Sequence, residues 1–338
     1  MTAEPCWVCY SVAMRTQPPD HLAPVPQDMR DALAKFGKQA EEIVGAFLST
    51  LEAAPSPEIL YHYTDESGLK GILTSGQLWL TDILTLNDPS ELTHGLTQAS
   101  QILNEKAADG PPETKLFAHD FEGFILAGKL QRSGEYFSAS FSSQGDDLTQ
   151  WQAYGNNARG YALGFDAKLL EELFRKEPGA PILSTFPVSY DDARLMSIDQ
   201  QLIDAMFGLI SLPRGWGLSN EAINGYMGEL FSLIAVHALH AGLHFKHEGY
   251  RHESEYRFLR VYPPETPSLR VKRRDRAGIS IKYEEFNWAA AGVSPLRRIV
   301  IGPAADTVLA AKLMRDLLPL PETAQVEIVP SRIPYRAS

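Results

Sequence analysis

Two glutamates one residue apart, Glu253 and Glu255 in the segment HESEYRF, form the pair most suggestive of chemistry. Side chains two positions apart on a strand point to the same face, so we expect both carboxylates to point the same way. Close carboxylates raise each other's pKa, which suits a general base or a group that stabilises a cation. Glu255 lies nearer the following apolar run and is predicted to be the more buried and more perturbed of the two. The alternative is a solvated strand end, where Glu253 pairs with Arg251 or Arg257 and has no chemical role.

A histidine and a hydroxyl lie near one another in the segment LYHYT. Strand alternation sends His62 and Thr64 to one face and Tyr61 and Tyr63 to the other. Such a pair can hold a ribose or an amide through hydrogen bonds. The alternative is a histidine at a strand end that bonds only to the backbone.

A third cluster combines small hydroxyls with aromatic rings. Ser138 and Ser140 in YFSASF share one strand face, and Trp151 and Tyr154 lie three residues apart on a predicted helix. The two rings then share a helix face and could stack on a flat ligand. Equally, an aromatic pair of this kind can belong to the core.

Four histidines recur at helical spacing near residue 240. Their three- and four-residue intervals place them on one side of a helix, where a metal could use them. Because no carboxylate lies inside the row, a polar helix face that packs or lines a pocket is favoured over a metal-dependent hydrolase. The row consists of His237, His240, His244 and His247.

Composition narrows the class of protein. The chain has 338 residues, 44% hydrophobic and 22% charged, with a net charge of -11, so nucleic-acid binding would need a local basic patch. No apolar run approaches the roughly 20 residues of a membrane span, and the N-terminus lacks signal-peptide features, so a cytoplasmic protein without membrane contact is expected. Glycine-rich phosphate loops, HExxH and GxSxG are absent from the sequence.

Local patterns predict the elements that must position these residues. Residues 1–27, with the CWVC pair Cys6 and Cys9, are expected to form a flexible tail, and 28–338 a single domain. Strands and helices do not alternate strictly, which favours an α+β fold with two small sheets and helices outside. Helices are predicted near 28–51, 66–75, 92–103, 114–127, 148–154, 305–317 and twice within 196–247; strands are predicted near 60–64, 77–82, 136–141, 160–166, 256–262, 298–301 and at VEIVPS.

Five blocks resemble a known family in content and order. LYHYT…GLKGIL…GQLWLT, LNDPSEL, FSASFS…QW…AYG…GYALGF, HESEYRFL and IVIGP…VPSRIPYR, spanning about 58–336, are similar to the bacterial domain-of-unknown-function family 2971. That family looks related to the ADP-ribosyltransferase fold. Asn87 and Asp88 belong to the family's own pattern and have no counterpart in that fold.

The resemblance implies roles for individual residues. An early-strand histidine, here His62, would hold the nicotinamide ribose of NAD, with Thr64 following it. A middle-strand hydroxyl would be Ser138 or Ser140, and the late-strand glutamate would be Glu255, with Glu253 ahead of it. The stacking ring is left open among four aromatic residues: Tyr63, Tyr136, Trp151 and Tyr154.

The implied activity is cleavage of the nicotinamide–ribose bond of NAD and transfer of ADP-ribose to an unknown acceptor, which could be protein, nucleic acid, a small molecule or water. NAD would be the substrate, no metal is expected, and a role as a toxin or defence protein is open. The alternatives are a non-catalytic binding or interaction protein that retains the fold, and a metal-dependent hydrolase built on the row His237–His247.

Overall fold

The computed structural model describes residues 22, 24–86, 93–126, 134–177, 182–214, 216–264, 266–276, 278–289, 294–318 and 326–335. Cys6, Cys9 and most of the predicted tail 1–27, and the family residues Asn87 and Asp88, lie outside these described residues. The end of the predicted tail is described, and there Leu22 and Val25 are buried in the bundle core instead of being flexible, because their apolar side chains pack against it.

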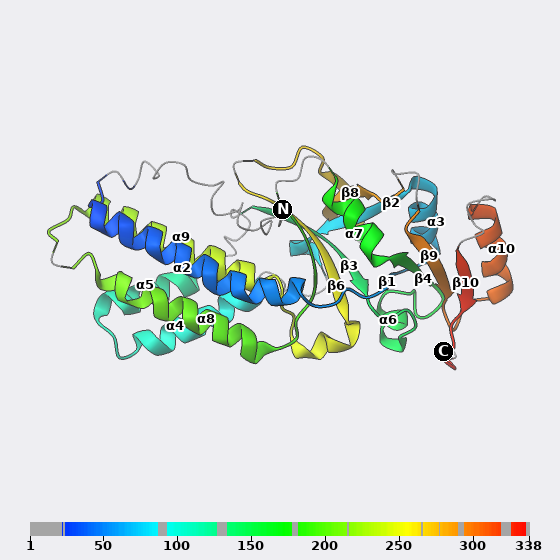
Figure 1. Cartoon of the computed structure of the whole chain (residues 1–338), viewed down its shortest axis with the longest axis horizontal. Coiled ribbons are helices and arrows are strands. Elements are labelled where there is room, and N and C mark those ends of the chain that lie inside the picture. The colour runs from blue at the N-terminus through cyan, green and yellow to red at the C-terminus, as the bar shows by residue number, and fades with distance from the viewer. Residues whose placement is uncertain are drawn as a thin grey trace.

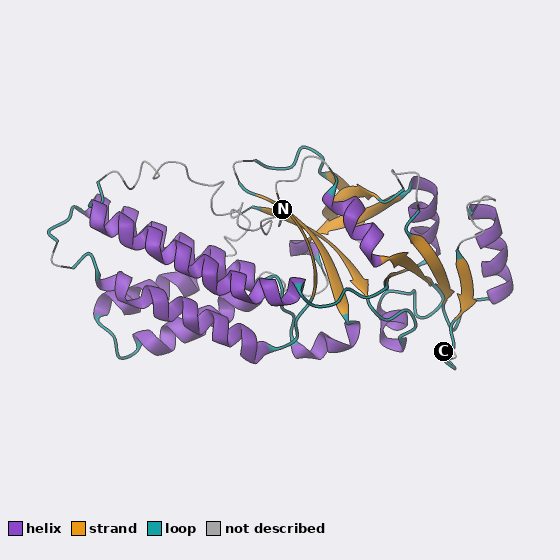
Figure 2. Ribbon diagram, in the orientation of Figure 1, coloured by secondary structure: helices purple, strands orange, loops and turns teal. Residues whose placement is uncertain are grey.

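Long helices form a bundle at one end of an elongated molecule, and the strands gather at the other end (Figures 1 and 2). Amphipathic spacing predicts most of these helices, since each buries one apolar stripe in the bundle core. The bundle helices are α2 (Gln27–Glu52), α4 (His94–Ala107), α5 (Pro112–Leu126), α8 (Asp192–Phe207) and α9 (Asn220–Gly242).

The helix α9 differs from its neighbours in being apolar along most of its length. Among the described helices it alone is long and apolar enough to cross a membrane, and half of its apolar window is buried within the protein. From the sequence, no apolar run long enough to span a membrane is expected. A helix at the centre of a bundle meets the same criterion, so this property is weak evidence for a membrane span.

The described strands join into one sheet rather than the two small sheets expected from the sequence. The order is β10-β9-β4-β1-β3-β2-β8-β7, with β6 between β3 and β5. The prediction of two sheets is wrong because β3 pairs with three strands and so connects both halves. The mixed α and β composition is confirmed. The strands are β1 (Ile59–Thr64), β2 (Gln77–Asp82), β3 (Glu135–Ser142), β4 (Tyr161–Asp166), β5 (Ile182–Pro187), β6 (Glu255–Tyr262), β7 (Lys272–Arg276), β8 (Ile279–Asn287), β9 (Leu296–Ile301) and β10 (Glu327–Pro330).

The strand β3 creates the opening that becomes the site. Along one edge it pairs with β6 over its whole length. Along the other edge it pairs with β1 at Ser142 and with β2 at Phe137 and Ser138. Between these contacts β1 and β2 separate, so neither is paired with the middle of β3, which includes Ser140.

Shorter helices cover the sheet face opposite the bundle. Apolar side chains of α3 (Glu66–Ser75), α7 (Ala167–Arg175) and α10 (Thr307–Leu317) share a core with that face. The bundle core includes Leu259 and Val261 of β6, so bundle and sheet are packed together. As predicted, Asp65 caps α3 by accepting a hydrogen bond from the Gly68 amide, and Gly76 ends it at φ 68°.

Some elements have no clear signal in the sequence. The helix α7 and the strands β5, β7 and β8 were not predicted, although the segments lie between predicted elements. The charged run KRRDR of β7 is exposed along an edge strand, so it lacks the apolar alternation by which strands are recognised.

Candidate functional site

A cavity of about 810 Å³ opens where β1 and β2 separate along β3. It also reaches the turn η5 (Glu248–Glu253) and the strands β7 and β8. The structure brings most of the predicted site residues to its wall; of the predicted residues, Trp151 and the stacking candidate Tyr136 do not reach it. The predicted residues that line it are His62, Tyr63, Thr64, Ser138, Ser140, Tyr154, Glu253 and Glu255.

Glu255, the first residue of β6, is buried and held by four hydrogen bonds. Its Oε1 accepts from Ser140 Oγ at 2.7 Å and from Arg257 Nε at 3.0 Å. Its Oε2 accepts from Lys246 Nζ at 3.3 Å and from an Arg257 Nη2 at 3.2 Å. A carboxylate offers about four acceptor positions, so all of them are engaged.

These neighbours decide how Glu255 ionises. Burial alone would raise its pKa, but the charges of Arg257 and Lys246 and the hydrogen bonds from Arg257 and Ser140 lower the pKa to about 2. Repulsion between the carboxylates predicts a raised pKa for Glu255; the direction is the opposite because two cations lie against the pair. At neutral pH Glu255 is therefore an ionised, weakly basic carboxylate.

Glu253 also contacts Lys246, but its backbone lies in a turn and not in the strand. It ends the 3₁₀ turn η5 instead of lying on the strand, and Ser254 between the two glutamates has φ 44° and ψ 48°. The predicted strand alternation is therefore not the reason the carboxylates converge. Glu253 Oε2 accepts from Lys246 Nζ at 2.7 Å and Oε1 from Tyr154 Oη at 2.8 Å.

Lys246 links the two carboxylates and was missed in the sequence. Its ammonium contacts both glutamates and lies 4.6 Å from the centre of the Tyr250 ring. Two buried carboxylates need a compensating charge, so a cation was to be expected near them. The segment HFKHE offers Lys246, but only the fold shows that it, rather than Arg251, faces the pair. Arg257, also missed as a site residue, is fully buried and donates to the Leu243 carbonyl at 3.0 Å.

The structure distinguishes the two candidate serines. Ser140 is exposed to the cavity in an otherwise mostly buried strand, and its hydroxyl donates to Glu255. Ser138 is 3% exposed, and its Oγ has no hydrogen-bond partner among the described residues. Ser140 is thus the hydroxyl paired with the carboxylate, while Ser138 leaves one polar atom of the wall unsatisfied.

His62 contacts the open stretch of β3 directly. Its Nδ1 lies 3.2 Å from the Ser140 carbonyl oxygen, which can only accept, so Nδ1 carries the proton. Burial lowers the pKa of His62 and outweighs the opposing effect of that carbonyl. The ring is therefore neutral at pH 7, and Nε2 has a free lone pair for a ligand hydroxyl or amide.

The aromatic candidates divide between wall and core. Trp151 is fully buried, with its ring 4.7 Å from Tyr63 and its Nε1 donating to Asp146, so it supports the wall from behind. Tyr63 and Tyr154 line the cavity, whereas Tyr136 lies in the bundle core. The expected shared helix face fails because α6 (Leu148–Ala153) ends before Tyr154.

The prediction that the histidine row lies on one side of a helix is wrong, because α9 ends at Gly242 and both His244 and His247 lie beyond it. Histidines of the row have hydrogen bonds of their own. His237 and His244 bond through Nδ1 to the Leu233 and His240 carbonyls at 2.7 and 2.9 Å. Burial lowers the pKa of His240 to about 3 and that of His244 to about 4, so both rings are neutral. Across the described ranges, no group of three or more histidine, cysteine, aspartate or glutamate side chains is placed to hold a metal ion.

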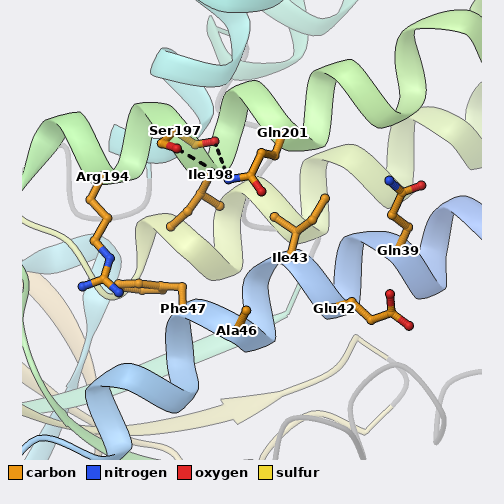
Figure 3. A pocket seen from close by; sticks show the side chains of 9 residues that line it. All are labelled: Gln39, Glu42, Ile43, Ala46, Phe47, Arg194, Ser197, Ile198 and Gln201. Atoms are coloured by element: carbon orange, nitrogen blue, oxygen red, sulfur yellow. Dashed lines mark hydrogen bonds between the residues drawn. The ribbon is translucent and has the colours of Figure 1, made fainter.

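A second hollow lies on the bundle between α2 and α8, with a volume of about 520 Å³ (Figure 3). The Arg194 guanidinium covers the Phe47 ring at 4.8 Å and donates to Thr50 at 2.6 Å. Glu42 lies toward the other end of this hollow. Its wall brings together no pair of acid and base groups, so it lacks the chemistry present at Glu255.

Comparison with known proteins finds one family that matches about a third of the chain. Residues 150–258 match the family described as "Protein of unknown function (DUF2971)". The matched segment includes Tyr154, Lys246, Glu253 and Glu255, and it supports the family indicated by the sequence blocks. No curated protein and no solved structure matches the chain.

Proposed function

We propose that this protein cleaves the nicotinamide–ribose bond of NAD and transfers ADP-ribose to an acceptor. The observation that supports the proposal is the contact chain from His62 through Ser140 to Glu255 on three adjacent strands, β1, β3 and β6. An early histidine, a middle hydroxyl and a late glutamate are the groups that the resemblance to ADP-ribosyltransferases implies. Here they share one cavity.

The ionisation of these groups suits this reaction. As the bond to nicotinamide breaks, its electron pair leaves with the positively charged ring, which departs neutral and needs no acid. The ribose carbon becomes cationic, and a fixed carboxylate such as Glu255 stabilises it electrostatically. Because the pKa of Glu255 is about 2, this role is more suitable for it than proton abstraction.

The neighbouring groups would bind the ribose and orient the acceptor. All acceptor positions of Glu255 are filled, so a ribose hydroxyl would exchange with Lys246, its longest contact at 3.3 Å, or bind to Ser140. Neutral His62 would accept a hydrogen bond at Nε2. Glu253 would position the acceptor, whose proton passes to solvent when the new bond to ribose forms.

The fully hydrogen-bonded state of Glu255 also favours a second candidate function, that of a protein that binds NAD without turnover. Glu255 is fully satisfied by the protein itself, as in a structural ion-pair network. The two candidates differ in one measurable product, since only the enzyme releases nicotinamide.

The test is incubation with NAD, with and without cell extract or nucleic acid, while nicotinamide release is followed. Glu255→Gln should lower the release at least ~100-fold, the scale of losing one preorganised electrostatic group. Ser140→Ala, which leaves the buried charges paired, should lower it about tenfold. Glu327→Gln, at an exposed carboxylate paired with Arg298, is the matched control and should leave it unchanged.

The outcomes separate the candidates. Binding of NAD without nicotinamide release supports the binding protein. A folded protein that shows no binding at millimolar NAD contradicts both candidates. Release that survives Glu255→Gln contradicts the assignment of Glu255.

A further inference from the structure

The wing of the sheet formed by β2, β8 and β7 presents one face to the same cavity. Cross-strand pairs set this face: Trp79 is opposite Glu285, Tyr283 is opposite Lys272, and Arg274 is opposite Ile281. Alternate residues of a strand share a face, so Trp79, Tyr283 and Arg274 lie on one side. Three strand spacings, or about 14 Å, separate β7 from β3, so Arg274 lies away from the Ser140–Glu255 pair, whereas Trp79 lies on β2, the strand next to β3.

Aromatic rings form an open surface at this wing. Trp79 is 42% exposed although it lies in the middle of a strand. Its ring centre is 4.4 Å from that of Tyr283, and the Arg274 guanidinium lies 4.9 Å from it. An indole that is held in place yet open to solvent can stack on a flat ring.

Two arginines here, Arg274 and Arg276, have no ion-pair partner among the residues that the structure describes. Arg274 Nε is buried with no hydrogen-bond partner among the described residues. Its Nη2 donates a long hydrogen bond of 3.4 Å to Thr81 Oγ1. Burial and the nearby charge of Arg276 lower the pKa of Arg274. Arg276 is exposed, and within the described chain no ion pair engages it. Lys272, by contrast, is matched by Glu285 at 2.7 Å.

A pair of cations with no carboxylate partner in the described part of the chain is unusual in a protein whose net charge is -11. Two arginines that repel each other beside a cavity create a position where an anion is favoured. An exposed indole next to them adds a stacking surface for a base. The anion and the flat ring together are the features of a nucleotide.

We propose that this face is a nucleotide subsite, in which a base stacks on Trp79 and a phosphate binds Arg274 and Arg276. The chemistry has two sources: the adenylate half of a dinucleotide bound in the cavity, or one nucleotide of a single-stranded nucleic acid. This subsite extends the proposed function: the first source, a dinucleotide, rests on the proposal that the protein uses NAD. Its test needs no turnover.

Binding of 5′-AMP, ADP-ribose and a ten-nucleotide oligothymidylate to the full chain is measured by calorimetry at fixed salt. Trp79→Ala should weaken binding about tenfold, within the range for one base stack. Arg274→Gln and Arg276→Gln should each weaken it about tenfold, as expected for a charge-assisted hydrogen bond. Arg273→Gln is the matched control, because Arg273 alternates to the opposite face of β7, across from Lys282.

Comparing the three probes shows whether the bound nucleotide belongs to a dinucleotide or to a nucleic acid. Loss of AMP and ADP-ribose binding in these variants assigns the subsite to the dinucleotide, and tighter, salt-sensitive oligothymidylate binding assigns it to nucleic acid. The proposal is overturned if no probe binds the wild-type protein, or if Arg273→Gln weakens binding as much as Arg274→Gln does. Nicotinamide release without any binding of the probes would contradict the subsite alone. Binding of the probes that depends on Trp79, without release, would contradict the catalytic proposal alone.

Discussion

At the scale of single residues, the site is governed by charges that the fold places against one another. Glu253, Glu255, Lys246 and Arg257 form a buried cluster whose formal charges sum to zero. Removing one member leaves a buried charge without its partner, which is far more costly than losing an exposed ion pair. The stability of the protein and the ionisation of its proposed catalytic group are therefore linked.

This linkage predicts how stability depends on acidity. The pKa of Glu255 is about 2 in the folded protein and 4.5 ordinarily, so its contribution is complete above pH 4.5 and is lost as pH falls toward 2. The loss amounts to about 3 kcal/mol. Urea unfolding between about pH 2.5 and pH 6 should show it, and the difference between wild type and Glu255→Gln should shrink as pH falls. A constant difference across this range would contradict the assignment.

The neutral state of His62 makes a second prediction. Because burial lowers its pKa below 6.5, the affinity for NAD should hold from pH 8 to pH 7 and reach half of its value only below pH 6.5. It should fall at lower pH, where protonation of Nε2 removes the acceptor. His62→Phe, which keeps a ring but removes both nitrogens, should weaken binding about tenfold at pH 8 to 7, and by less at lower pH, where the wild type has itself lost the acceptor. Calorimetric titration with NAD measures both effects, and a decline already between pH 8 and 7 would contradict the neutral ring.

At the scale of elements, a single turn brings the glutamates together. Glu253 belongs to η5 and Glu255 to β6, and the left-handed conformation of Ser254 joins them. That conformation is costly for residues with a side chain and most costly for β-branched ones. The turn is secured by Ser142, whose hydroxyl donates to the Glu253 carbonyl at 2.7 Å.

Substitutions at Ser254 should therefore separate turn geometry from chemistry. Ser254→Gly fits the left-handed region and should leave both stability and nicotinamide release unchanged within a factor of about two. Ser254→Val should cost about 1–2 kcal/mol of stability and reduce release, because Glu253 and Glu255 no longer meet at Lys246. Thermal unfolding and the release assay test this. Equal behaviour of the two variants would show that the turn does not set the site.

At the scale of the whole molecule, the bundle and the sheet share one apolar core, in which Leu259 and Val261 of β6 pack with the bundle helices. The bundle also contains an unusual polar residue, Asp199 of α8. It is fully buried, and neither of its carboxyl oxygens has a hydrogen-bond partner among the described residues. Burial raises its pKa well above 3.8.

Replacing Asp199 should stabilise the protein, and the way the unfolding signals shift shows whether bundle and sheet unfold together. A raised folded pKa means that stability falls as pH rises above 3.8, so Asp199→Asn should match wild type near pH 4 and exceed it by about 1–3 kcal/mol near pH 8. Asp204→Asn on the same helix gives the contrasting result: the hydrogen bond from Lys106 lowers the pKa of Asp204, so this variant should lose stability relative to wild type as pH rises. Helical circular dichroism and tryptophan fluorescence should shift together. If only the helical signal shifts, the bundle unfolds separately, and the prediction of one domain over 28–338 is wrong.

The features that could be predicted from the sequence are those set by interactions between residues close together in the chain. Caps such as Asp65 and Asp147, the left-handed Gly76 and amphipathic spacing act over a few residues, so most helices and strands were predictable. The alternation in LYHYT and YFSASF likewise identified His62 and Ser140, because side-chain direction in a strand follows from the backbone alone.

Which of these residues come into contact, and in what ionisation state, depends on contacts between distant parts of the chain. Pairing of β3 with three strands opens the cavity, and that pairing depends on contacts between residues more than fifty positions apart. The approach of Lys246 and Arg257 reversed the expected shift in the pKa of Glu255, since a pKa responds to every nearby charge and not to sequence neighbours alone. The edge strand β7, which carries no apolar pattern, gained its place beside Trp79 through pairing with β8.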